Sequence, residues 1–126
     1  MTWLWVALAG GVGAGLRLLV DSWVASRNTS DVPLGTMTVN TLGSFGLGVV
    51  TALAVANPAL GEARLIVGVG LLGGFTTFST ACVEIVRLGL RDGSRATLTS
   101  FIHSTGMVVL GLLSAVLGLW LGTLVS

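Results

Sequence analysis

The sequence predicts an all-α membrane protein with four transmembrane helices in each subunit. Of its 126 residues 53% are hydrophobic and only 9% are charged, whereas an ordinary soluble domain carries about 25% charged residues. The 19 glycines agree with this class, because glycine is costly in soluble helices but frequent in transmembrane ones. Since one span needs about 20 mainly apolar residues, four spans would leave only short loops. This composition argues against a soluble enzyme, a nucleic-acid-binding protein or a disordered linker.

Four apolar stretches are long enough to cross a membrane, at about residues 3–24, 34–56, 63–90 and 96–125. Pro33 precedes the second stretch and Asn57-Pro58 follows it, as is common where helices start and stop. No basic residue precedes the first stretch, so we expect a retained helix rather than a cleaved signal peptide.

The expected connections between these helices are short and polar, at residues 26–32, 57–62 and 91–95. Such links make successive helices run antiparallel, and an even number of helices puts both termini on the same side of the membrane. We therefore expect residues 1–126 to form a single four-helix transmembrane domain.

Small residues at four-residue spacing occur on every expected span. Pairs of this kind allow the close backbone approach on which helix packing in lipid depends. They are Gly11 and Gly15, Ser44 and Gly48, Gly70 and Gly74, and Gly118 and Gly122. Packing within one bundle explains most of them, but their presence on all four spans also suggests contacts between subunits.

The loop arginines are divided unequally between the two ends of the expected bundle. Arg64 alone lies at the end that carries the termini, whereas Arg27, Arg87, Arg91 and Arg95 lie at the opposite end. Cytoplasmic loops of membrane proteins carry an excess of basic residues. This distribution predicts that the first and third connections are cytoplasmic and that the termini lie outside.

Asn40 lies in the first half of the second span. An amide without hydrogen-bond partners in lipid would cost several kcal/mol. We therefore expect its side chain to face a bundle interior or a water-filled path. An interhelical hydrogen bond that serves only assembly explains the residue equally well.

The middle of the third span combines glycines with hydroxyl residues. Four of each occur there, namely Gly68, Gly70, Gly73 and Gly74, then Thr76, Thr77, Ser79 and Thr80. The pattern predicts a helix broken at Gly73-Gly74 in the middle of the membrane, although a flexible continuous helix also fits the composition. Irregular backbone at that depth persists only where it is buried in protein or lines a cavity.

Catalysis has no support in the residues. His103 is the only histidine and Cys82 the only cysteine, so neither a metal cluster nor a nucleophile–base pair is expected. Residues 10–15 are rich in glycine but lack a phosphate-binding motif.

Four segments carry more specific patterns. Residues 10–17 are rich in glycine and end in an arginine, residues 35–45 read GTMTVNTLGSF, residues 73–80 read GGFTTFST ahead of Glu84, and residues 111–118 read GLLSAVLG. In order and spacing these segments resemble the helix motifs of the Fluc (CrcB) family of fluoride channels. The resemblance covers nearly the whole chain.

The resemblance implies an antiparallel, dual-topology dimer of four-helix subunits that conducts fluoride passively across a bacterial-type cell membrane. Such a channel lowers cytoplasmic fluoride and protects against its toxicity. It also implies a structural sodium ion, not transported, that is held at the broken third helix by backbone carbonyls of both subunits. The positions that match those carbonyls are Gly73 and Thr76.

The same resemblance implies an ion pathway and an entrance to it. Asn40 and Phe78, with the neighbouring Ser79, match positions along the fluoride path. An amide N–H and the positive edge of an aromatic ring are both suited to a dehydrating anion. Arg17 matches an arginine near the aqueous vestibule, where it would attract anions.

Three positions depart from the family pattern. Ala81 stands where a second pore phenylalanine is usual, His103 where a tyrosine is usual, and Met107 where a serine is usual. Alanine has no ring edge, so a pore that needs both aromatics from this subunit would be impaired. Together with the unequal arginines, this favours a heterodimer with a paralogue over a homodimer.

Two other functions stay open. One is a non-conducting partner subunit, which Ala81 suggests. The other is a small coupled efflux transporter, which would need a carboxylate deep in the membrane to exchange with protons. Asp21 and Glu84 lie near span ends instead, where we expect Arg17 and Arg87 to pair with them.

Overall fold

Four long helical segments make up the fold in a computed structural model that describes residues 1–91, 93 and 95–126. No strand occurs in these residues. The third segment is composite, whereas the others are single helices. In chain order the elements are α1 (Thr2–Arg27), α2 (Leu34–Ala56), the 3₁₀-helix η1 (Pro58–Leu60), α3 (Gly61–Ala63), the π-helix η2 (Arg64–Leu72), α4 (Gly73–Phe75), α5 (Ser79–Gly89) and α6 (Ala96–Leu124).

All four segments are long and apolar enough to cross a membrane, which confirms the expected all-α class. Their ends differ from the sequence prediction in two places. The first helix continues to Arg27, and the third segment is helical from Pro58, so the expected connection at residues 57–62 is largely helical. Asn57 explains the early start, because its side-chain oxygen accepts a hydrogen bond from Ala59 N at 3.1 Å and so caps the first turn.

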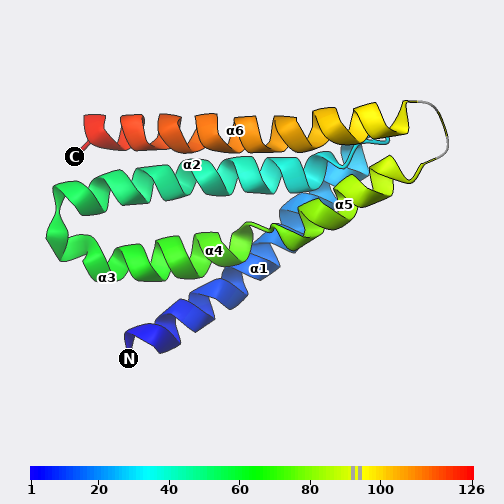
Figure 1. The fold of residues 1–126 in the computed structure, drawn as a ribbon. Helices are drawn as coiled ribbons and strands as arrows, with labels where there is room; N and C mark the ends of the chain where they lie inside the picture. Colours follow the sequence, from blue (N-terminus) through cyan, green and yellow to red (C-terminus); the bar gives the residue numbers. More distant parts are fainter. Residues whose placement is uncertain (92, 94) are drawn as a thin grey trace.

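Both termini lie at the same end of the bundle, as the even number of helices predicts (Figure 1). Helices α2 and α6 lie side by side along their length and share the most extensive helix–helix contact (Figure 1). Glycines make this approach possible. A Cβ on Gly118 would clash with the backbone of Phe45, and one on Gly122 would lie 2.6 Å from Ala52 Cβ.

Helix α1 crosses the third segment by similarly close contacts. A Cβ on Gly74 would meet the backbone of Gly10, and one on Gly13 would lie 2.9 Å from Phe75 N. The predicted pair of Gly11 and Gly15 does not take part, because a Cβ on either residue meets no atom of this chain within 4 Å. The packing glycines of α1 are therefore on a different face from the one that simple spacing indicated.

We predict that Gly48→Ala destabilises the protein by about 1–3 kcal/mol, the usual cost of overpacking. The added methyl group would lie 2.7 Å from Leu119 N and even closer to Ala115 O. Thermal unfolding in detergent measures the effect. Gly61→Ala is the matched control, because it meets no atom within 4 Å; equal melting temperatures for both variants would contradict the packing role of Gly48.

Candidate functional site

The third segment is interrupted between α4 and α5, at residues 76–78. Gly73 and Gly74, where the sequence predicted the break, are still helical, and Thr76 is the first residue with extended backbone (φ −80°, ψ 159°). Thr76 keeps its own helical bond, since its N–H donates to Leu72 O at 3.0 Å. The interruption thus lies among the hydroxyl residues rather than at the paired glycines.

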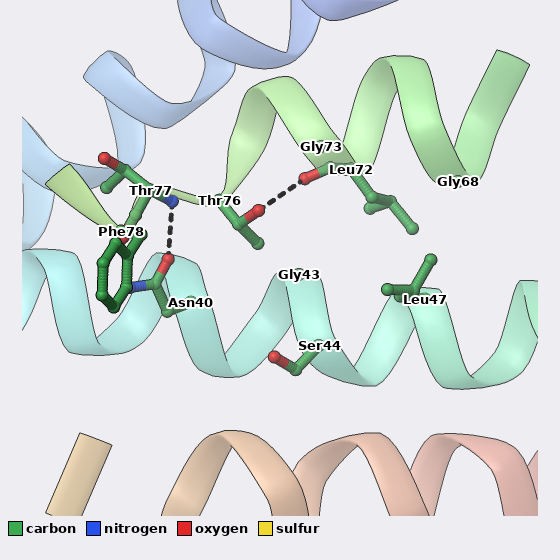
Figure 2. Close-up of a pocket in the computed structure, with 10 residues that line it drawn as sticks. All are labelled: Asn40, Gly43, Ser44, Leu47, Gly68, Leu72, Gly73, Thr76, Thr77 and Phe78. Carbon is green, nitrogen blue, oxygen red and sulfur yellow. Dashed lines mark hydrogen bonds between the residues drawn. The ribbon is translucent and has the colours of Figure 1, made fainter. Parts of the chain in front are cut away.

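Asn40 of α2 explains why the chain can leave the helix at that point. Its Nδ2 donates to Thr77 O and its Oδ1 accepts from Thr77 N, both at 2.8 Å. One amide therefore satisfies both backbone groups of one residue, and Figure 2 shows the two residues facing each other. The interhelical hydrogen bond that the sequence allowed is therefore present. Only one of the two Nδ2 hydrogens is needed for it.

Gly43 provides the space for this contact. A Cβ on Gly43 would clash with the Thr76 methyl group and lie 3.3 Å from Phe75 Cδ1. Any larger residue at this position would push the interrupted backbone away from α2. Gly43, Thr76 and Thr77 therefore form one structural unit with Asn40, a pairing that residue spacing alone did not indicate.

Backbone groups on both sides of the interruption are left free. No hydrogen bond within the described residues reaches the carbonyl oxygens at the end of α4, which belong to Gly73, Gly74, Phe75 and Thr76. On the other side, Thr80 N donates to Thr77 Oγ1 at 3.3 Å, whereas no acceptor within the described residues reaches the N–H groups of Phe78 and Ser79 at the start of α5. Free carbonyls can hold a cation, and free N–H groups at a helix start favour an anion.

A cavity of about 280 Å³ lies between α2 and the third segment (Figure 2). Its wall joins the interruption to the face of α2 that carries Asn40. The lining residues are Asn40, Gly43, Ser44, Leu47, Gly68, Leu72, Gly73, Thr76, Thr77 and Phe78. Two sequence-predicted residue types, the amide and the aromatic ring, are thus brought to one surface.

Phe78 stands between this cavity and a second one of about 210 Å³. The second cavity is also lined by Ala81 and Met107, two of the positions that depart from the family pattern. The Phe78 side chain is 84% exposed, whereas Ala81 is 6% exposed. Asn40 and Phe78 line both cavities, so these two residues mark the point where they meet.

Three predicted site residues lie outside these cavities. Ser79 is exposed at the start of α5, with its Oγ 3.5 Å from Thr77 Oγ1. His103 is buried in α6 and lines neither cavity. Arg17 is half-buried in α1, and its Nε has no hydrogen-bond partner among the described residues.

The expected ion pairs of Arg17 with Asp21 and of Arg87 with Glu84 do not form among the described residues. Glu84 Oε1 instead accepts a hydrogen bond from Thr36 Oγ1 at 2.7 Å. The Asp21 carboxylate lies against Gly35 at the start of α2, where a helix N-terminus attracts negative charge. Glu84 thus bonds to a residue of another helix instead of pairing with the arginine one turn away.

The described residues contain no group of three or more His, Cys, Asp or Glu side chains that could hold a metal ion.

Comparison with known proteins identifies the family. The family model described as "CrcB-like protein, Camphor Resistance (CrcB)" matches residues 4–119. A protein of Cutibacterium acnes named fluoride-specific ion channel FluC 2 is 46% identical over 98% of both chains. Another from Leifsonia xyli subsp. xyli, named fluoride-specific ion channel FluC 1, is 50% identical over 94% of this chain and 85% of its own. Because both the model and these relatives span nearly the whole sequence, the chain belongs to the CrcB-like family.

Proposed function

We propose that this chain is a subunit of a fluoride-selective channel that lets fluoride leave the cell passively and so limits its toxicity. Identity of 46–50% to proteins named fluoride-specific ion channels, over nearly the whole chain, carries the proposal. The family is one of channels rather than enzymes. The four apolar segments support a multi-pass position in a cell membrane.

The arrangement of Asn40 and Phe78 supports a path for a small anion. Asn40 has an amide hydrogen that its bonds to Thr77 do not use. The exposed Phe78 ring can turn its positive edge toward an anion. We place the interruption at residues 76–78 in the middle of the membrane, because it lies well inside the apolar segment Pro58–Gly89. Ser79 follows along the path, and Arg17 attracts anions at the vestibule.

The free carbonyls at the end of α4 support a structural sodium ion. Those of Gly73 and Thr76 belong to the set that no protein donor reaches in the described chain. Unwound backbone carbonyls are common ligands for sodium in membrane proteins. We propose that two subunits contribute carbonyls to one ion, which is held and not transported.

An antiparallel dimer accounts for the open surfaces of the subunit. Phe78 is exposed in the single chain, and both cavities it borders are open clefts. Gly11 and Gly15 leave a smooth strip on α1 that meets no atom of its own chain. A second subunit would enclose the ion path and cover these surfaces.

We propose a paralogue as the second subunit, because Ala81 supplies no ring and the arginines are unequally placed. A single favoured orientation would put the connection after α1 in the cytoplasm and the termini outside. Ala81 also favours the second candidate function, a partner subunit whose own pore does not conduct.

Reconstitution of this chain alone into liposomes tests the proposal. We expect fast, voltage-driven, fluoride-selective efflux from a self-sufficient channel. Efflux only after a paralogue is added would establish the heterodimer. Proton-driven efflux of organic cations, with no fluoride flux in either case, would contradict the proposed function.

Phe78→Ile tests the aromatic ring. We expect fluoride flux to be abolished while the protein remains assembled, because an aliphatic chain has no positive edge to offer an anion. Phe101→Ile is the matched control, since Phe101 is an exposed ring on α6 outside both cavities. Equal flux in the two variants would remove Phe78 from the path.

Asn40→Asp tests the amide. The carboxylate keeps the acceptor for Thr77 N but places a second oxygen against Thr77 O, and it adds a negative charge to an anion path. We expect flux to fall by about tenfold or more, which corresponds to about 1.4 kcal/mol of added barrier. Asn57→Asp, which changes the cap of η1, is the control. Undiminished flux in Asn40→Asp would contradict the pore position of Asn40.

A further inference from the structure

Two neighbouring clefts lie at the end of the bundle where α1 and α5 end and α2 and α6 begin (Figure 1). The first, of about 370 Å³, lies between the α1–α2 connection and α5. The second, of about 220 Å³, lies between the same connection and the start of α6. They share the lining residues Asp31, Val32, Leu88 and Arg91, and the proposed ion path uses neither cleft.

Three arginines line these clefts. Arg87 and Arg91 line the first, and Arg91 and Arg95 line the second. Within the described part of the chain, Arg87 and Arg95 make no ion pair, and Arg91 Nη1 lies 3.8 Å from Asp31 Oδ1. The Asp31 side chain is 93% exposed, and a long, exposed pair of this kind contributes little. The guanidinium groups therefore keep donors available for another anion.

The acids at this end do not balance the arginines. Glu84 also lines the first cleft, but its Oε1 accepts a hydrogen bond from Thr36 Oγ1. Residues 26–32 and 87–95 together contain four arginines and two aspartates, of which Asp92 lies outside the described residues. The connections at this end therefore carry a net positive charge.

The arginines lie where an apolar segment ends. Arg87 is in the last turn of α5, and Arg91 follows that helix directly. Exposed apolar side chains alternate with them, since Val86 is 58% exposed and Leu90 79%. A soluble anion would use only the charge of this surface, whereas a lipid would use both the charge and the apolar side chains beside it.

We propose that the two clefts bind the phosphate head group of an anionic phospholipid, with Arg91 between them as the central ligand. The planar guanidinium group matches two phosphate oxygens at once. Basic residues that directly follow a transmembrane helix commonly recognise anionic head groups. The acyl chains would lie along Val86 and Leu90. This site does not depend on fluoride transport, so it stands or falls separately from the proposed function.

Native mass spectrometry of the full chain in a neutral detergent tests the site. We expect short-chain phosphatidylglycerol to bind saturably to the wild type. Arg91→Gln should weaken this binding by about fivefold, the usual contribution of one arginine near an anionic surface. Arg64→Gln is the matched control, because it removes the same charge at the opposite end of the bundle. Equal weakening in the two variants would overturn the assigned location.

Two further probes of the wild type make the test independent of variant folding. Phosphatidylcholine with the same acyl chains should bind about tenfold more weakly or less, because its head group carries no net charge. Inorganic phosphate, which lacks acyl chains, should not displace phosphatidylglycerol at equal concentration. Equal binding of the two lipids would overturn recognition of the anionic head group. Equal binding of inorganic phosphate would overturn a lipid as the occupant.

Discussion

The two hydrogen bonds between Asn40 and the backbone of Thr77 are the interaction on which the rest of the site depends. A helix that stops inside an apolar segment exposes N–H and C=O groups that lipid cannot satisfy. The Asn40 amide provides one donor and one acceptor at 2.8 Å each, in the same arrangement that a neighbouring peptide would provide. With Thr77 satisfied, Phe78 can turn to the surface and α5 can start in a new direction, while the carbonyls at the end of α4 stay free.

Glycine packing lets the helices come close enough for these bonds. Gly43 admits the Thr76 side chain against α2, and Gly74 admits the backbone of Gly10 against the third segment. The π-helix η2 leads directly into this region. Turns of π-helix are rare in proteins as a whole, but those that occur are often found at functional sites. In lipid, where apolar burial contributes little between helices, such close packing is one of the forces that hold helices together.

Helix α5 is held to α2 at two levels. Asn40 bonds to the residues just before its start, and Thr36, one turn earlier on α2, bonds to Glu84 near its middle. One contact reaches the interruption just before α5 and the other reaches α5 itself, so both hold this part of the third segment against α2. The layer around Thr36 and Glu84 extends to α6 through Ser100, which links the fourth helix to the two that form the cavities.

The sequence by itself determined the four apolar spans, the common side of the termini and the family, because hydrophobic length, turn residues and motif spacing are local properties of the chain. It also indicated Asn40 and an interrupted third helix. Only the tertiary structure decided where the interruption lies, because the partner that replaces the helical bonds, Asn40, comes from another helix. The partner of Glu84 was likewise decided by packing, since Thr36 is brought to it from another helix.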